Sequence, residues 1–296
     1  MTNSQMVLDR KILVLGASGF IGQHLLDVWG EGAVGTHKST PCKNTQFFDP
    51  LTMDIAKIEK VRECSHAVIL YGEREPDACW KHPELTYELN VASTKRVILQ
   101  CINLGIKPVF ASSEMVFSGS KGMYEETDIP DPILLYGKYK VEVESFLAEN
   151  SDDYLVFRLS KVMGVTKNDR SIFANWLAEL ESSEAGIIRC AQDQYFSLIA
   201  ISDVSRLLTA LLSSTSLGVY HFSDGIRHRR LDLLNLLLTE FEKLTTKRFI
   251  VHPVSINDFG LPEIRPLDLS MSSLQLAPFN ASGFTTPSSC VKQLLG

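Results

Sequence analysis

The sequence has no excess of basic residues and no long apolar run, and each absence excludes a class of protein. It carries 29 Lys and Arg residues against 35 Asp and Glu residues in 296, a formal net charge of −6. Nucleic-acid-binding proteins usually have a basic patch or a basic overall balance, so we expect no nucleic-acid partner. No apolar stretch approaches the roughly 20 residues that span a bilayer, so we expect no membrane partner.

The cysteines lack the clustering that marks a metal site or a disulfide framework. None of the six forms a C-x-x-C pair or lies in a cluster with histidine. This spacing predicts reduced thiols and no bound metal. The polar first residues lead directly into an apolar strand, without the longer apolar core of a signal peptide. We therefore expect a cytoplasmic protein.

Short apolar segments alternate with helical segments in the first half of the chain. Lys11–Leu15 (KILVL) predicts a strand, Gly16–Gly22 a turn and Phe20–Trp29 a helix. Further strands are predicted at 33–36, 67–71, 108–112 and 154–158 and one ending near residue 48, with helices at 83–104 and 137–149. This alternation is typical of a Rossmann-type, doubly wound parallel α/β sheet. We expect residues 1–160 to form an NAD(P)-binding domain.

The second half of the chain alternates less regularly. Helices are predicted at 172–181, 203–213 and 231–244 and strands at 186–189 and 219–222. The last roughly 50 residues are predicted to be loops with short elements. We expect residues 161–296 to form a smaller α+β lobe that binds substrate and returns strands and helices to the Rossmann sheet. Ligands in such sheets bind at the carboxyl ends of the strands.

The glycine turn LVLGASGFIG is a candidate phosphate site. Gly16 would permit the tight bend, Gly19 would let the backbone approach a pyrophosphate, and Gly22 would allow the helix to pack closely on the sheet. The free N–H groups at the helix start would then face phosphate oxygens. A glycine turn without a ligand is the alternative, and the flanking strand and helix favour the cofactor.

The acidic residue that usually bonds the ribose 2′-hydroxyl, about 20 positions after the first glycine, is missing. Thr36, His37 and Lys38 stand there instead. A hydroxyl, an imidazole and an ammonium favour a 2′-phosphate, so we expect NADP(H) in preference to NAD(H). The alternative is that Lys38 is an ordinary surface lysine.

Ser113, Tyr136 and Lys140, about 100 residues or more after the glycine turn, are a candidate site for carbonyl chemistry. Tyr136 and Lys140 are spaced i,i+4 at the start of a predicted helix, which puts both side chains on one face. An ammonium beside a phenol favours the phenolate, so the pair can deliver a proton to a carbonyl oxygen while a hydride arrives. Ser113 follows a buried strand, and its hydroxyl can bond the same oxygen.

The chain contains, in this order, the motifs GASGFIG, PELTYELNVAS, ASSEMVF, YEETD, YGKYK, FRLSKVMG, DQYFS, GVYHFS and IRPLDLSM. Together they resemble the extended short-chain dehydrogenase/reductase family, and most of all its dTDP-4-dehydrorhamnose reductases. The resemblance covers essentially the whole chain. It implies that Ser113, Tyr136 and Lys140 are the catalytic triad, with Lys140 also bonding the nicotinamide ribose.

The resemblance further implies that Ser18–Ile21 hold the pyrophosphate, that Asp49 lies by the adenine, and that residues 71–73 pass under the cofactor. The candidate cofactor residues are Gly16, Ser18, Gly19, Phe20, Ile21, Gly22, Thr36, His37, Lys38, Asp49, Tyr71, Gly72, Glu73, Tyr136 and Lys140.

Some positions depart from the family pattern. Glu114 stands where the family often has aspartate, Tyr139 replaces a serine, and Lys161 stands where rhamnose reductases place a tryptophan beside the sugar. We expect Ser113, Glu114 and Lys161 to bind substrate. Glu114 is followed by Met115 and not by a second acid, unlike the Thr-Asp-Glu pattern of nucleotide-sugar dehydratases, and this favours reduction over elimination.

The sequence thus predicts an NADPH-dependent reductase of a nucleotide-linked 4-keto-6-deoxy sugar, with a role in polysaccharide biosynthesis. One alternative is an epimerase or epimerase-reductase that retains NAD(P). Another is a non-catalytic NADP-binding regulatory subunit that resembles the one of methionine adenosyltransferase. We expect a nucleotide-sugar ligand and, as the candidate assembly, a homodimer.

Two other features have structural interpretations. Asn90, on the predicted long helix, is expected to anchor backbone groups and not to order a catalytic water. His228–Arg230 is expected to be a surface loop, with phosphate binding as the alternative.

Overall fold

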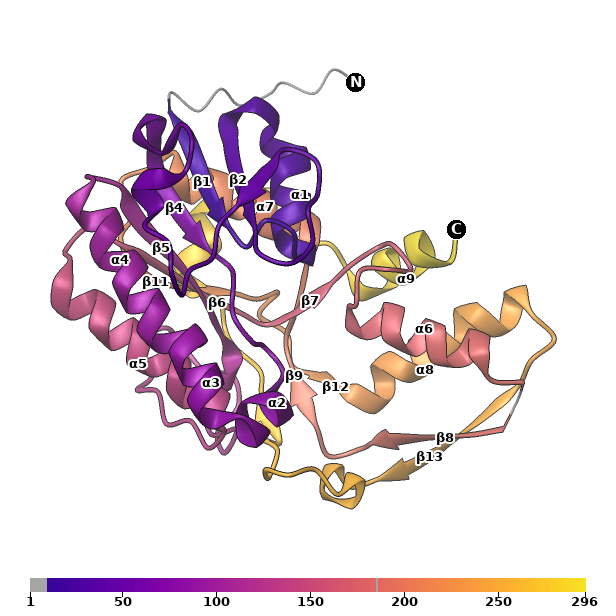
Figure 1. The fold of residues 1–296 in the computed structure, drawn as a ribbon. Helices are drawn as coiled ribbons and strands as arrows, with labels where there is room; N and C mark the ends of the chain where they lie inside the picture. The colour runs from indigo at the N-terminus through magenta and orange to yellow at the C-terminus, as the bar shows by residue number, and fades with distance from the viewer. Residues whose placement is uncertain (1–9, 185) are drawn as a thin grey trace. The chain divides into compact units, whose positions relative to one another are not determined.

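The computed structural model describes residues 10–184 and 186–296, drawn in Figure 1. These residues form two compact units, each assembled from three segments of the chain. The first unit comprises the described residues up to Ser112, then Leu135–Phe157 and Leu208–Val219; the second comprises Ser113–Leu134, Arg158–Leu207 and Tyr220–Gly296.

A seven-stranded sheet has the strand order β11-β6-β5-β4-β1-β2-β3. The ladders from β3 through β2, β1 and β4 to β5 are all parallel. The chain winds outward from β1 in both directions, so the predicted doubly wound Rossmann class is confirmed. The strands are β1 (Lys11–Leu15), β2 (Ala33–His37), β3 (Thr45–Phe47), β4 (Cys64–Ile69), β5 (Lys107–Ser113), β6 (Leu155–Leu159) and β11 (Gly218–Phe222).

Burial on both faces explains the apolar composition of these strands. Ile12, Leu13, Val14 and Leu15 of β1 are all 0% exposed. A parallel sheet that is covered by helices on both sides has no solvent face, so its strands are continuously apolar. In such a sheet, the point where the strand order reverses beside β1 is where ligands bind.

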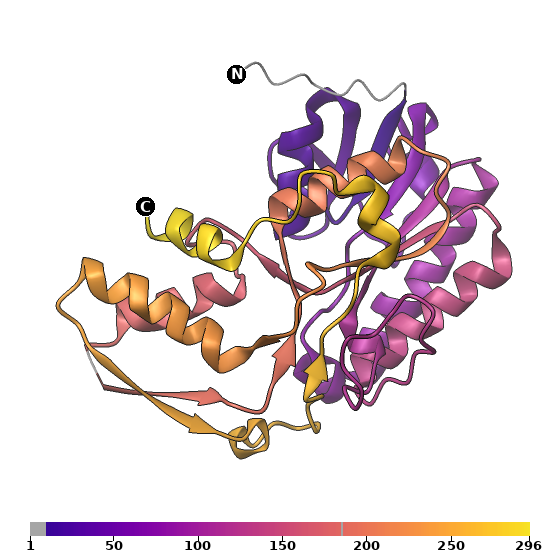
Figure 2. The ribbon, with the colours of Figure 1, turned by 180° about the vertical axis from the view of Figure 1, so that it is seen from behind.

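Helices cover both faces of the sheet, as Figures 1 and 2 show for α3, α4 and α5 on one side and α1 on the other. The Nε1 of Trp29 at the end of α1 donates to Thr209 Oγ1 of α7 at 2.8 Å, both within the first unit. The helices are α1 (Phe20–Trp29), α2 (Pro76–Lys81), α3 (Pro83–Tyr87), α4 (Ser93–Asn103), α5 (Leu135–Asn150) and α7 (Ile201–Leu212).

The helix predicted at 83–104 forms with one irregularity. α3 continues into α4 through a π-helical turn at Glu88–Ala92, which carries Asn90. A π-turn inserts an extra residue into the helical ladder and is often found at functional sites. The hydrophobic periodicity of the sequence does not reveal it.

Among its described residues, the second unit contains the α-helices α6, α8 and α9 and three small sheets. β8 pairs with β13 in parallel, β7 pairs with β10, and β9 lies between β12 and β14. The elements are β7 (Lys161–Met163), α6 (Ile172–Ser182), β8 (Gly186–Ala191), β9 (Tyr195–Phe196), β10 (Leu198–Ala200), β12 (His228–Arg229), α8 (Arg230–Leu244), β13 (Phe249–Val254), β14 (Asp268–Leu269) and α9 (Pro287–Leu295).

The prediction of loops with short elements after residue 244 did not locate β13 or α9. β13 contains Pro253, which is unusual in a strand, and it pairs in parallel with β8, which is remote in sequence. α9 does carry a local signal, because Thr286 caps it by accepting from Ser289 N at 3.2 Å and Pro287 is its first residue. Among residues 10–184 and 186–296, no helix has the length and apolar composition needed to cross a bilayer.

Candidate functional site

The glycine turn after β1 contains two glycines that the fold requires and one that it does not. Gly16 has φ +86°, and a Cβ there would lie 2.7 Å from Tyr71 N. A Cβ on Gly22 would lie 2.5 Å from Ala17 Cα. A Cβ on Gly19 would meet only Gly16 O, at 3.4 Å, which is an ordinary contact. Gly16 makes the predicted bend, Gly22 packs against the backbone of the turn, and a Cβ on Gly19 would have one neighbour within 4 Å.

The same turn leaves the N-terminus of α1 open. Gly19 is the N-cap, no described side chain caps the helix, and its first turn holds no acidic residue. The first N–H groups of a helix lack intrahelical partners and carry a partial positive charge, which favours an anion. A pyrophosphate fits this turn, because it would occupy the space beside Gly19 and accept from these groups.

The three residues predicted to face the 2′ position make different contacts. Thr36 is 1% exposed, and its Oγ1 accepts from Gly16 N at 3.2 Å, so this hydroxyl supports the glycine turn. His37 Nδ1 lies 2.8 Å from Thr45 Oγ1. Lys38 Nζ, on a side chain that is 42% exposed, forms an ion pair with Asp49 Oδ1 at 3.0 Å. Lys38 is therefore the group of the three that presents a charge to solvent.

Asp49 is held as a carboxylate. Burial pushes its pKa upward, but the Leu51 N–H, the Lys38 ammonium and the nearby Arg96 outweigh burial and keep the pKa below its usual value. The Leu51 N–H donates to Asp49 Oδ1 at 3.0 Å. The pairing with Lys38 was not predicted, since nothing local in the sequence links the end of β2 to the loop after β3.

The loop after β4 is fixed by Asn90. Glu73 N donates to Asn90 Oδ1 at 2.7 Å, and Asn90 Nδ2 donates to Glu73 O at 2.8 Å. Gly72 has φ +136°, and a Cβ there would lie 2.7 Å from Asn90 Oδ1. Ser93 Oγ donates to the Tyr71 hydroxyl at 3.3 Å, and burial raises the pKa of Tyr71 to about 12. The predicted anchoring role of Asn90 is confirmed.

Tyr136 and Lys140 lie one turn apart on α5, as predicted. Lys140 Nζ is 5.5 Å from the centre of the Tyr136 ring and 4.6 Å from that of Phe110. It donates to Ala111 O of β5 at 2.8 Å. Burial lowers the pKa of Lys140 to about 8, although Glu144 and Cys79 favour its charge. The ammonium thus lies beside the Tyr136 ring. One of its three N–H groups donates to Ala111 O, and two more are donors.

Ser113 is the last residue of β5, two positions beyond Ala111. Its Oγ accepts from Met115 N at 3.2 Å and donates to Glu114 Oε2 at 3.0 Å. The other oxygen of Glu114 forms an ion pair with Lys161 Nζ at 3.1 Å. The structure therefore brings together all three residues predicted to bind substrate, but the two charged ones are bonded to each other. Sequence reasoning did not anticipate this pair.

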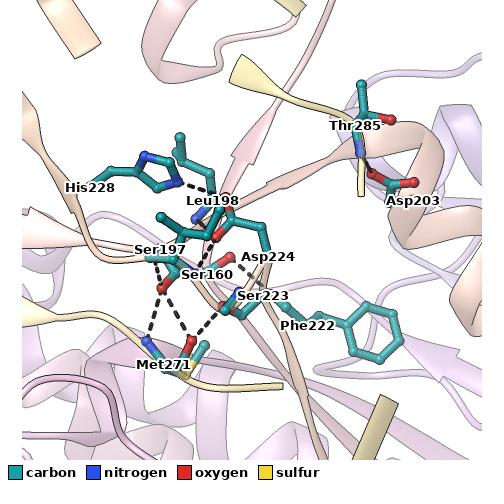
Figure 3. A network of polar contacts seen from close by, with 12 residues as sticks. Ser160, Ser197, Leu198, Asp203, Phe222, Ser223, Asp224, His228, Met271 and Thr285 are labelled. Atoms are coloured by element: carbon teal, nitrogen blue, oxygen red, sulfur yellow. Dashed lines mark hydrogen bonds and ion pairs between the residues drawn. The ribbon is translucent and has the colours of Figure 1, made fainter. Parts of the chain in front are cut away.

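Buried hydrogen bonds join the motifs DQYFS, GVYHFS and IRPLDLSM. Figure 3 shows one residue of each, Ser197, Ser223 and Met271, in contact. Met271 N donates to Ser197 Oγ at 3.0 Å, and Ser223 Oγ donates to Met271 O at 2.7 Å. All three residues are 0% exposed. Buried polar groups of this kind hold segments in place because leaving any of them unpaired is costly. The motifs DQYFS, GVYHFS and IRPLDLSM thus share a structural role.

The prediction that His228–Arg230 is a surface loop is wrong, because His228 and Arg229 form β12 and Arg230 is the first residue of α8. His228 Nε2 lies 2.6 Å from Asp224 Oδ2 (Figure 3). Arg229 Nε donates to Gln192 O at 2.6 Å, and Arg230 Nη1 donates to Gln194 Oε1 at 2.9 Å. These contacts give the segment a structural role. All six cysteines are free thiols, and no described group of three His, Cys, Asp or Glu residues could hold a metal ion.

Comparison with known proteins gives relatives of two kinds. Over 164 residues, the chain is 28% identical to methionine adenosyltransferase 2 subunit beta of Bos taurus, covering 53% of this chain and 48% of that protein. The chain thus spans about half the length of this relative. Over 224 residues it is 26% identical to the probable low-salt glycan biosynthesis reductase Agl14 of Haloferax volcanii, covering 71% of this chain and 73% of the relative.

The fold is that of a solved dTDP-4-dehydrorhamnose reductase from Bacillus anthracis in complex with NADP. The TM-score is 0.78 at 20% identity, covering 97% of this chain and 99% of that one. Residues 10–292 match the family model described as the RmlD substrate binding domain. The predicted resemblance is confirmed, and the chain belongs to the RmlD substrate-binding-domain family.

Proposed function

We propose that this protein is an NADPH-dependent reductase of a nucleotide-linked 4-keto-6-deoxy sugar. The observation that carries the proposal is the Lys140 ammonium held 5.5 Å from the Tyr136 ring. A buried phenol beside a buried cation is suited to giving up a proton, because the cation stabilises the phenolate that remains. The glycine turn that fits a pyrophosphate supports a nicotinamide cofactor beside this pair.

This proposal gives each residue of the site a role in the reaction or in holding the cofactor. NADPH, when bound, supplies the hydride to the keto carbon. Tyr136 gives the proton to the keto oxygen, and Lys140 stabilises the resulting phenolate and bonds the nicotinamide ribose. Ser113 contacts the same oxygen of the sugar and orients it. The open N-terminus of α1 and the space beside Gly19 hold the pyrophosphate.

We further propose that NADP(H) is preferred to NAD(H). The partly exposed Lys38 ammonium at the end of β2 supports this, because a 2′-phosphate would share it with Asp49. The Bacillus anthracis structure was solved with NADP, which also supports it. A role in polysaccharide biosynthesis is supported by the relative named as a glycan biosynthesis reductase.

Oxidation of NADPH and of NADH is the test, measured against TDP-, GDP-, UDP- and CDP-linked 4-keto sugars. We expect turnover with one nucleotide carrier and a higher kcat/KM with NADPH than with NADH. Conversion of a nucleotide sugar without net NADPH consumption would indicate an epimerase instead. A flat response to every sugar would contradict the reductase.

Activity is expected to fall as pH rises through about 8, because the Lys140 ammonium loses its proton there. Below that pH the group is charged and stabilises the phenolate; above it the group is neutral and does not. The measurement is kcat/KM from about pH 6 to about pH 10, which reports groups of the free enzyme. Lys140→Arg keeps its charge to far higher pH, so its remaining activity should lack this step. A wild-type profile that is flat across pH 8 would assign Lys140 another role.

A second candidate function is a regulatory subunit. The relatives named as methionine adenosyltransferase subunits favour it. It predicts stable co-purification with an enzyme partner, NADP binding and no turnover in the sugar panel. Turnover at an ordinary enzymatic rate would exclude a purely regulatory role.

A further inference from the structure

The Ser113 hydroxyl has a single proton, and the structure directs it to a carboxylate. Ser113 Oγ donates to Glu114 Oε2 at 3.0 Å, while Met115 N donates to Ser113 Oγ at 3.2 Å. A serine hydroxyl has one donor and two acceptor positions. With the donor and one acceptor position used, Ser113 can offer a ligand only its remaining lone pair.

Lys161 determines which chemical group of residue 114 meets Ser113. Its Nζ lies 3.1 Å from Glu114 Oε1, and Glu114 is only 3% exposed. A lysine ammonium has donors and no acceptor, so it holds an oxygen of residue 114 on its own side. A carboxylate then has its second oxygen left for Ser113, and that oxygen can only accept.

We propose that Glu114 and Lys161 make Ser113 a hydrogen-bond acceptor, so that the site binds the alcohol form of the sugar more tightly than the ketone. This inference rests on the proposed function. A hydroxyl on the reacting carbon can donate to Ser113, whereas a keto oxygen has no hydrogen to donate. To bond a ketone, Ser113 must give up its charge-assisted bond to Glu114. Glu114 and Lys161 are therefore positioning residues that act through Ser113.

The substitution Glu114→Gln tests this because it changes polarity and keeps shape. Lys161 still requires an oxygen, so it holds the amide oxygen of the substituted side chain and leaves the amide nitrogen facing Ser113. That nitrogen is a donor, which fills the last lone pair of Ser113 and frees its proton for a keto oxygen. The variant should reverse the preference for the alcohol.

The measurement is the dissociation constant of each sugar in a complex that cannot react. The 4-keto sugar that the enzyme reduces in the panel above is titrated into the NADP⁺-loaded enzyme, and its 4-hydroxy product into the NADPH-loaded enzyme. Glu114→Gln should raise the ratio of the alcohol constant to the ketone constant roughly tenfold, since hydrogen bonds to charged groups differ from neutral ones by about that factor. An unchanged ratio would overturn the proposal.

Two control variants separate a relay through Ser113 from a general disturbance. In a Ser113→Ala background, Glu114→Gln should leave the ratio unchanged; a shift that persists there would contradict the inference. Glu181→Gln removes an exposed ion pair, Lys167 Nζ to Glu181 Oε1 at 2.6 Å, in the same unit. This control should leave the ratio at the wild-type value.

Failure of the proposed function can be distinguished from failure of this inference. In that case the wild type turns over none of the sugars, and the ion pair is then tested by thermal unfolding alone. Lys161→Met should lower the Tm more in the wild type than in Glu114→Gln, because only the former leaves a buried carboxylate without its cation. An equal decrease in Tm in both backgrounds would mean that Lys161 does not hold Glu114. That result would also overturn the inference.

Discussion

Tyr136→Phe is expected to lower kcat for sugar reduction roughly 10²–10⁴-fold, the usual contribution of a positioned acid or base, with cofactor affinity nearly unchanged. The hydroxyl removed is the proton donor of the proposed reaction, and the ring that packs against Lys140 remains. The measurements are steady-state NADPH oxidation and a titration with NADP⁺.

Tyr139 provides a matched control on the same helix. Its hydroxyl donates to Pro83 O at 2.8 Å, and its side chain is buried like that of Tyr136. Tyr139→Phe should cost a little stability and leave kcat within a few-fold of the wild type. If Tyr136→Phe retained turnover comparable to Tyr139→Phe, another group would have to supply the proton.

Gly22→Ala and Gly19→Ala are expected to separate folding from cofactor binding. A Cβ at Gly22 would lie 2.5 Å from Ala17 Cα, so the backbone of the glycine turn would have to shift to admit it. We expect this variant to lose about 1–3 kcal/mol of unfolding free energy, as overpacking typically costs, and to bind NADP⁺ weakly because the turn moves. The measurements are chemical denaturation and the dissociation constant for NADP⁺.

Gly19→Ala should keep its stability, because its Cβ would meet only Gly16 O at 3.4 Å. It should nevertheless bind NADP⁺ at least about tenfold more weakly, a loss of about 1.4 kcal/mol, since the methyl group would occupy the pyrophosphate space. Gly32→Ala, where a Cβ meets nothing within 4 Å, is the control and should change neither quantity. Wild-type affinity in Gly19→Ala would place the pyrophosphate elsewhere.

Most of the fold could be predicted because its signals are local. The helix at Phe20–Trp29 forms with the predicted bounds, and β5 extends the predicted strand by one residue at each end. Such elements depend on periodic apolar residues and on glycine at a turn, all within a short window. β13 was missed because Pro253 obscures its pattern and its partner β8 is remote in sequence.

In the candidate site too, features that depend on local sequence could be predicted, and contacts between remote elements could not. The facing of Tyr136 and Lys140 follows from their spacing on one helix, and the bend at Gly16 follows from the turn. The bonds from Lys38 to Asp49, from Asn90 to Glu73 and from Lys161 to Glu114 join different elements. No local pattern contains those pairs.

The sequence by itself determined the doubly wound sheet, the glycine turn and the spacing of the Tyr136 and Lys140 pair, because each depends on neighbours within a few turns of chain. Only the tertiary structure decided that Lys161 reaches Glu114 and that Glu114 takes the proton of Ser113. The physical reason is that the direction of a hydrogen bond depends on which charged group folding brings within about 3 Å. Remote elements must pack before that group is determined.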